Sequence, residues 1–191
     1  MVMIIIKKIN KNIFSLFLVF LISCSSQNSK NNIIDDKCKL IKDNSLSRVS
    51  FSDNESELSN LELNQFYNAN NNFDIIFYNH EEGSINYNLK RFFKNEQNEW
   101  IKVTIINGKR IQTILNFSES EIIDSLNKLE TNGYFQYCGI CFDCQYYTFL
   151  IKSNQAYFKY YSSKLTFSGI SDAEKVELSN YINIFNYFFD K

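Results

Sequence analysis

The chain of 191 residues has no proline, only five glycines and a single histidine. With so few glycines it contains no Gly-rich phosphate loop, and neither the zinc-protease spacing nor the calcium-loop spacing occurs. A Ser-His-Asp or Cys-His site would have to use His80, which stands beside Glu81 and Glu82 in a predicted hairpin turn. A histidine in a turn is most often a solvated surface group. We therefore expect no catalytic residue, no metal ion and no cofactor, and a protein that is not an enzyme.

The chain also lacks an excess of positive charge. Its 20 basic and 21 acidic residues give a formal net charge of −1. A mildly acidic chain has no electrostatic footprint for nucleic acid, and this one has no polybasic stretch that would bind anionic lipid. We therefore expect no nucleic-acid partner.

One continuous apolar run is present, near the N-terminus. It covers residues 13–22, follows Lys7, Lys8 and Lys11, and precedes Ser23. A basic segment, a short apolar segment and a small residue are the parts of a signal peptide. The apolar run is about half as long as the ~20 residues that a membrane-spanning helix needs. It therefore predicts a signal peptide rather than a permanent transmembrane anchor.

The end of this segment, Leu21-Ile22-Ser23-Cys24, resembles the lipobox of bacterial lipoproteins: an aliphatic residue, a tolerated second residue, a small residue and the invariant cysteine. The resemblance covers the first 24 residues. It implies that residues 1–23 are removed and that Cys24 carries the lipid, because two or three acyl chains anchor a protein stably whereas one binds only marginally. The alternative is a plain secretory signal that ends near a cysteine.

Residues 24–37 are expected to form the lipidated cysteine and a flexible tether, since they are polar and show no apolar periodicity. Lipoproteins can carry an acidic export signal directly after the cysteine, but the first acids here are Asp35 and Asp36. The resemblance therefore implies a bacterial envelope lipoprotein, bound to the membrane by its anchor. An outer-membrane position facing the periplasm is favoured over the cell surface.

Residues 38–191 are predicted to form one α+β domain, with clear patterning from about residue 73. Apolar residues alternate along several segments, and Asn107-Gly108 between two of them is a strong hairpin signal, because a type I′ turn needs positive φ at both positions. Four antiparallel strands in meander order follow from this pattern. They are expected at 73–78, 84–90, 101–105 and 111–115. Residues 39–72 show no decisive pattern.

The period then becomes helical. Ser118–Glu121 and Ser171–Glu174 both match the capping box that begins a helix. Between the two helices, strands are expected at 134–138, 144–152 and 155–161. We therefore predict an antiparallel β-meander sheet with two amphipathic helices packed on one face. The expected apolar stripes are Ile122, Ile123, Leu126 and Leu129 in the first helix, and Val176, Ile182, Phe185 and Phe189 in the second.

Four cysteines remain after Cys24, namely Cys38, Cys138, Cys141 and Cys144. An even number in an exported protein favours disulfides. If 134–138 and 144–152 form a hairpin, Cys138 faces Cys144 at its neck, and Cys141 at its tip is left for Cys38. This pairing is our hypothesis.

Other chemistries for the cysteine cluster stay open. All four thiols could hold zinc. Cys138-Gly-Ile-Cys141 resembles the thioredoxin-type Cys-Gly-x-Cys, although the proline and the preceding tryptophan of that motif are missing. An iron–sulfur cluster would need a fourth nearby ligand, and position 148 is Thr.

Aromatic residues are dense between 134 and 161, where they could form a core or a stacking surface for sugar, peptide or a partner protein. Tyr146 and Tyr157 fall on the strand face opposite to Tyr147, Phe149 and Phe158, and are therefore the possible binding surface. We expect a non-catalytic binding domain for an unknown envelope protein or ligand. The alternatives are a thiol–disulfide or metal-handling protein that uses the cysteine cluster, and an immunity-type lipoprotein that blocks a toxin.

Overall fold

The computed structural model describes residues 38–43, 48–49, 57–81, 87–130, 132–139, 145–153, 156–163 and 167–189. The chain divides into two units, Met1–Asp35 and Asp36–Lys191, and every described residue belongs to the second. The predicted signal peptide, Cys24 and the tether lie outside the described residues. None of the helices within the described ranges is long and apolar enough to cross a membrane.

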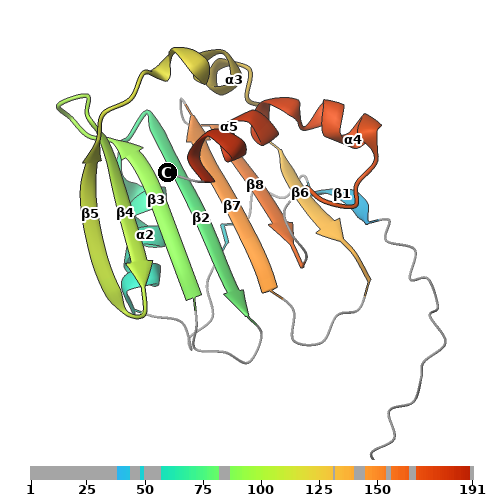
Figure 1. Ribbon diagram of the computed structural model, residues 1–191, viewed down its shortest axis with the longest axis horizontal. Coiled ribbons are helices and arrows are strands. Elements are labelled where there is room, and N and C mark those ends of the chain that lie inside the picture. Colours follow the sequence, from blue (N-terminus) through green and yellow to red (C-terminus); the bar gives the residue numbers. More distant parts are fainter. Residues whose placement is uncertain are drawn as a thin grey trace, which may run out of the picture. The chain divides into compact units, whose positions relative to one another are not determined.

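Eight strands form one sheet in the order β1-β6-β8-β7-β2-β3-β4-β5 (Figure 1). All neighbouring strands are antiparallel except β6 and β8, which are parallel. The α+β class is therefore confirmed, with a mostly antiparallel sheet. The strands are β1 (Lys39–Asp43), β2 (Phe73–Glu81), β3 (Tyr87–Lys94), β4 (Trp100–Ile106), β5 (Lys109–Leu115), β6 (Gly133–Tyr137), β7 (Gln145–Ser153) and β8 (Ala156–Ser162).

The predicted four-strand meander is confirmed as β2 to β5. The turn between β4 and β5 is made by Asn107 and Gly108, whose φ angles of 51° and 70° are both positive, as a type I′ turn requires. At the centre of the sheet both faces are covered, so that Ile75 and Ile76, which are neighbours on β2 and point to opposite faces, are both fully buried.

The prediction that β6 forms a hairpin with β7 is wrong. β6 pairs antiparallel with β1 and parallel with β8. The reason is that β7 has no free edge: it pairs with β2 from Phe73↔Ser153 to Glu81↔Gln145, and with β8 on its other side. β1 belongs to the stretch for which the sequence shows no decisive pattern.

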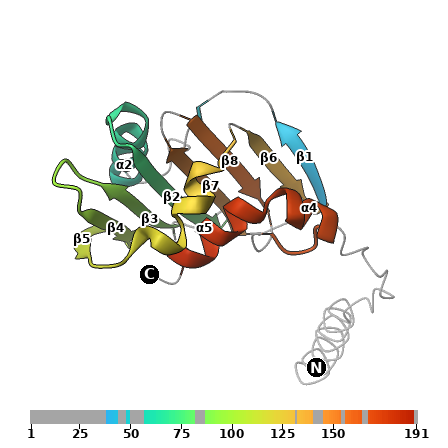
Figure 2. The same cartoon turned by 90° about the horizontal axis from the view of Figure 1, so that it is seen from above.

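Helices cover both faces of the sheet (Figure 2). On one face, called the α5 face below, lie a 3₁₀ turn η1 and the helices α3, α4 and α5. On the other, called the α2 face, lies α2. Their bounds are α2 (Glu57–Asn68), η1 (Glu119–Glu121), α3 (Ile123–Asn127), α4 (Asp172–Glu177) and α5 (Ser179–Phe189).

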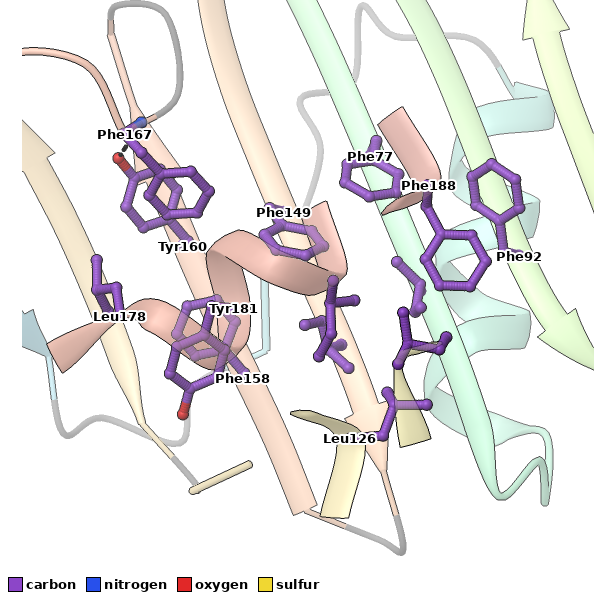
Figure 3. Close-up of a cluster of buried hydrophobic side chains, with 14 of the residues drawn as sticks. Phe77, Phe92, Leu126, Phe149, Phe158, Tyr160, Phe167, Leu178, Tyr181 and Phe188 are labelled. Atoms are coloured by element: carbon purple, nitrogen blue, oxygen red, sulfur yellow. Dashed lines mark hydrogen bonds between the residues drawn. The ribbon is translucent and has the colours of Figure 1, made fainter. Parts of the chain in front are cut away.

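The core of the α5 face is mostly aromatic (Figure 3). The rings of Phe77 and Phe149, on adjacent strands, stack with centroids 4.7 Å apart. Tyr181 of α5 stacks on Phe158 at 3.6 Å, and Phe188 lies 4.9 Å from Phe92. Such ring pairs stabilise a core beyond the area that they bury. They hold α5 against the centre of the sheet.

The first predicted helix is shorter and begins differently. Ser118 accepts a hydrogen bond from the amide of Ser120 rather than from that of Glu121, so a 3₁₀ turn forms where the capping box was expected. The apolar stripe of this helix is in place, with Ile122 and Leu126 buried. Ile123 and Leu129 are half-buried against the same core.

The second capping box is confirmed, because the Ser171 hydroxyl accepts from the Glu174 amide while the Glu174 carboxylate accepts from the Ser171 amide. The predicted stripe is wrong at Val176 and Phe189, whereas Ile182 and Phe185 pack against the core. Val176 is 74% exposed and Phe189 is exposed, while Ile182 and Phe185 are half-buried. The helix is interrupted at Leu178, between α4 and α5. After this point, each buried residue is the one directly before a predicted stripe residue. The buried residues are Leu178, Tyr181, Ile184 and Phe188.

Candidate functional site

A pocket of about 450 Å³ opens on the α5 face, where the C-terminal end of α5 lies over β2, β3, β4 and β7. We call it the α5 pocket. Its apolar part is made by Phe77 and Phe149 from the sheet and by Phe185 and Phe189 from the helix. The Phe185 ring contacts both Phe77 and Phe189, with centroids 5.4 and 4.7 Å apart. The aromatic rings thus form a continuous apolar surface from the sheet to the helix.

The polar part of the pocket lies near the C-terminal end of β2 and the N-terminal ends of β3 and β7. Asn79 of β2 stands between its cross-strand partners Asn88 of β3 and Tyr147 of β7, and all three line the pocket. Thr104 of β4 lines it as well, opposite Lys90 of β3. Cross-strand partners point to the same face. The register therefore places amide, hydroxyl and phenol groups side by side.

Lys90 contributes the positive charge at this site. Its Nζ donates a hydrogen bond of 2.7 Å to the main-chain oxygen of Phe189 and lies 5.8 Å from the centroid of the Phe189 ring. A cation at the last residue of a helix is favourable, because the helix dipole is negative there. Lys90 thereby holds the end of α5 at the pocket, and no acidic side chain lines the pocket within the described part of the chain.

Its size and lining match those of small-molecule sites, which are usually clefts of about 300–1,000 Å³ with apolar walls and a few polar groups. The polar groups of Asn79, Asn88 and Thr104 can donate and accept hydrogen bonds without carrying charge, and the Tyr147 hydroxyl, which donates to Gln145 Oε1 at 2.6 Å, can accept one. They offer neither a strong nucleophile nor a general base at neutral pH. The arrangement can bind and orient a neutral ligand.

The two tyrosines predicted as a binding surface both lie on the α2 face but in different surroundings. Tyr157 is half-buried against α2, with its ring 6.2 Å from Phe66 and 6.0 Å from Tyr67. Tyr146 stacks on His80 at 5.3 Å and on Tyr161 at 5.7 Å. The structure therefore places Tyr157 in the support of α2 and Tyr146 in a separate half-buried row of rings.

This aromatic row, formed by His80, Tyr146, Tyr161 and Phe135, crosses β2, β7, β8 and β6. The prediction of a solvated turn histidine is wrong. β2 extends to Glu81, and its pairing with β7 makes His80 a half-buried strand residue. Its Nδ1 is buried and has no hydrogen-bond partner among the described residues.

The structure contains a disulfide between Cys38 and Cys138, whose Cα atoms are 4.2 Å apart. The predicted pairing of Cys38 with Cys141 and of Cys138 with Cys144 is therefore wrong. The reason is the unexpected pairing of β1 with β6, whose register sets Lys39 opposite Tyr137 and so brings the adjacent cysteines together. Cys141 and Cys144 lie outside the described residues.

The same bond bears on the other uses considered for the cluster. Both a four-cysteine zinc site and a Cys138–Cys141 redox pair need Cys138 as a free thiol, whereas here its sulfur is bonded to Cys38. Cys38 is buried and Cys138 packs against the α5-face core. The disulfide thus joins the first strand of the domain to β6 across 100 residues of sequence.

A group of buried charges beneath α2 was not predicted. Arg91 of β3 is 1% exposed and binds Asp74 of β2 through two nitrogens, at 2.9 and 2.6 Å. It also binds Glu62 of α2 at 2.9 Å, and Arg110 of β5 binds Glu62 at 2.7 Å. We call these four residues the charge cluster. The alternation through Leu89 would have placed Arg91 on the buried face.

Within the charge cluster, burial and ion pairing shift the pKa values in opposite directions. Burial raises the pKa of Asp74, against the lowering effect of Arg91. The paired carboxylates of Asp74 and Glu62 raise the pKa of Arg91. Nearby, burial lowers the pKa of Lys152, whose Nζ donates to the main-chain oxygen of Phe66 near the end of α2 at 2.7 Å. The cluster and Lys152 together hold α2 on the sheet.

The α5 pocket is thus a concave site with both apolar walls and converging polar groups. The charge cluster is internally paired, Lys152 donates to main-chain oxygens, and the aromatic row is a stacked, half-buried surface. Comparisons of the chain with protein-family models, with curated proteins and with solved structures find no match.

Proposed function

We propose that the protein is a lipoprotein of the bacterial cell envelope whose α+β domain binds a ligand without catalysis. The lipobox-like Leu21-Ile22-Ser23-Cys24 supports the anchor. The disulfide between Cys38 and Cys138 supports an oxidising compartment, because such bonds persist in exported proteins and are rare in the cytosol. An outer-membrane position facing the periplasm fits the lack of acids directly after Cys24.

The anchor is tested by detergent phase partition of the full chain from membranes. The wild type and a Ser25→Ala control are expected in the detergent phase, and Cys24→Ala in the aqueous phase, because only Cys24 carries acyl chains in this proposal. A Cys24→Ala variant that stays in the detergent phase would overturn the lipid anchor.

The α5 pocket is the observation that carries the binding function. Its hydrogen-bonding groups on Asn79, Asn88, Thr104 and Tyr147 are uncharged, and Lys90 already donates to the end of α5. Its apolar part is aromatic. A compact neutral ligand with hydroxyl or amide groups on one side and an apolar face on the other, such as a sugar ring, satisfies both parts.

The binding test compares two adjacent tyrosines of β7 that point to opposite faces. N-acetylglucosamine and its oligomers, which carry hydroxyl and amide groups, are titrated into the full chain by calorimetry. We expect Tyr147→Ala to weaken binding about tenfold, which is the loss of roughly one hydrogen bond, and Tyr146→Ala to leave it unchanged.

Two results would contradict the binding proposal. An equal or larger loss in Tyr146→Ala would move the site to the aromatic row of the other face. No binding of the wild type to any of these sugars would overturn the ligand class. An Asn79→Ala variant gives an independent check, since this residue stands at the centre of the polar row.

A further inference from the structure

The sheet has two edge strands, and they are protected very differently. At the β1 edge, the amide of Leu40 donates to the Glu174 carboxylate of α4 at 3.1 Å, and the amide of Cys38 donates to the oxygen of Gly169 at 2.9 Å. At the β5 edge, no hydrogen bond from another element to the main chain of β5 occurs within the described part of the chain, apart from its pairing with β4. Open edges are templates for pairing with another chain.

β5 also exposes apolar side chains along this open edge. Ile111 is 55% exposed and Ile114 is 65% exposed, on opposite faces of the strand. Ile106, on the neighbouring β4, is exposed as well. The usual protections of an edge, namely proline, a bulge or charges spread along the strand, do not occur in residues 109–115. Its two charges, Lys109 and Arg110, stand together at one end.

The hairpin turn determines which main-chain groups of β5 point outward. In a two-residue turn, the flanking pair Ile106 and Lys109 exchanges hydrogen bonds, and hydrogen-bonded pairs then alternate with non-bonded pairs along the ladder. Lys109, Ile111, Thr113 and Leu115 therefore direct their amides and carbonyls to β4. Those of Arg110, Gln112 and Ile114 point away from the sheet.

A second copy of the same strand fits this pattern. We propose that two copies of the chain pair antiparallel through β5, with Gln112 opposite Gln112 on a two-fold axis. Arg110 then lies opposite Ile114 and Ile111 opposite Thr113, so every outward amide and carbonyl finds a partner and no like charges meet. The interface is isologous and closes as a dimer.

Other registers of the same strand pair are poorer. Centring the pair on Arg110 would set two guanidinium groups opposite each other, and like charges in that position are destabilising. Centring it on Ile114 would pair only the last residues of β5 and leave Arg110 without a partner strand. Charge and length both favour Gln112 as the centre.

Cross-linking tests the register directly in membranes that hold the full chain. Opposite residues of a hydrogen-bonded pair have Cα atoms about 5.5 Å apart, which suits a disulfide, so Gln112→Cys is expected to form a covalent dimer under copper phenanthroline. Thr113→Cys is the matched control. It is also exposed, but its diagonal separation of about 7–8 Å disfavours a disulfide. Equal cross-linking of both variants, or of neither, overturns the register.

The mass of the purified full chain in detergent tests the dimer itself. Light scattering, corrected for bound detergent, should give twice the mass of one chain for the wild type and the mass of one chain for Gln112→Pro. Proline removes an amide that points away from β4, so this variant should still unfold in one cooperative thermal transition, as a folded chain does. A wild type that is monomeric, or a dimer that survives Gln112→Pro, overturns the proposal.

Discussion

The two faces of the sheet hold their helices by different interactions. On the α5 face, stacked rings such as Phe158 and Tyr181 join helix to strands, and the Cys38–Cys138 disulfide lies at the margin of the same core. On the α2 face, Arg91 is buried between carboxylates of the sheet and of α2. Apolar packing tolerates small changes of shape, whereas a buried ion pair depends on every partner. The two faces should therefore respond differently to mutation.

The surfaces of the two faces also differ. Around the end of α5 the aromatic core continues into a pocket whose polar part carries amide and hydroxyl groups and one cation, Lys90. On the other face, Tyr157 supports α2, and the rings around Tyr146 stack on one another. The face with the more apolar core thus carries the concave site. The four predictions below test this contrast, from the largest expected effect to the smallest.

Removing the disulfide with Cys38→Ser and Cys138→Ser should cause the largest loss. The bond closes a loop with a sequence separation of 100, for which the chain-entropy estimate is about 4.7 kcal/mol of unfolding free energy. Urea unfolding of the full chain measures it. The wild type under reducing conditions is the control and should lose a similar amount, and a loss below about 1 kcal/mol would show that this link is not a main support of the α5 face.

Arg91→Met should cost about 4 kcal/mol, because it leaves the Asp74 carboxylate buried without its arginine and leaves Glu62 with Arg110 alone. Urea unfolding again measures the loss. Adding Asp74→Leu and Glu62→Leu should recover much of it, since apolar side chains of similar volume often replace buried ion pairs without loss. If the triple variant is less stable than Arg91→Met, the loss in Arg91→Met does not come from the unpaired carboxylates, and the charge cluster itself stabilises the α2 face.

Tyr157→Ala should cost about 2 kcal/mol, less than a fully buried ring, because it removes a half-buried ring that packs against Phe66 and Tyr67. Tyr146→Ala is the matched comparison on the same face and should cost less than half as much, since the ring of Tyr146 stacks on His80 and Tyr161 of the aromatic row. Equal losses in urea unfolding would mean that the row supports the fold as strongly as the packing of α2.

The smallest effect is expected at the second capping box. Ser171→Ala should cost about 1 kcal/mol at neutral pH. Hydrogen bonds from Ser171 hold the pKa of Glu174 below its ordinary value of 4.5, so the folded state binds a proton less readily than the unfolded chain. The stability that these hydrogen bonds add is fully present above pH 4.5, the ordinary pKa of Glu174. It is lost as the pH falls from there through the lower pKa of Glu174 in the folded state.

Unfolding at a series of pH values checks this sign. The difference in stability between the wild type and Glu174→Gln should shrink as the pH falls below about 4.5. A difference that grows towards acid pH would contradict the assignment.

The contrast between the faces also explains which elements could be predicted from the sequence. β4 buries alternate apolar residues from Ile101 to Ile105, and Asn107-Gly108 supplies the turn to β5, so this part of the pattern can be recognised from residues close in sequence. The helix α2 buries Glu62 and Ser59 beside Leu63 and Phe66. A helix that buries charged and polar residues has no clean apolar stripe, and its existence was therefore not predicted.

The candidate site could be predicted only in part. Alternation correctly places Tyr147 and Tyr146 on opposite faces of β7. The residues near Tyr147 in sequence do not indicate that it lies in one row with Asn79 of β2 and Asn88 of β3. The pocket also depends on the end of α5, where the interruption at Leu178 shifts the buried stripe by one residue. A shift of one residue turns a helix by about 100°.

By itself the sequence determined the α+β class, the meander from β2 to β5 and the capping box at Ser171, because turn chemistry, capping and alternation act between residues close in the chain. Only the tertiary structure decided that β6 pairs with β1, that Cys38 therefore bonds to Cys138, and that Arg91 is buried between two acids. These outcomes depend on which strand edges and which charges are still unpaired once the rest of the domain has formed. That competition among distant segments is not encoded in any short stretch of sequence.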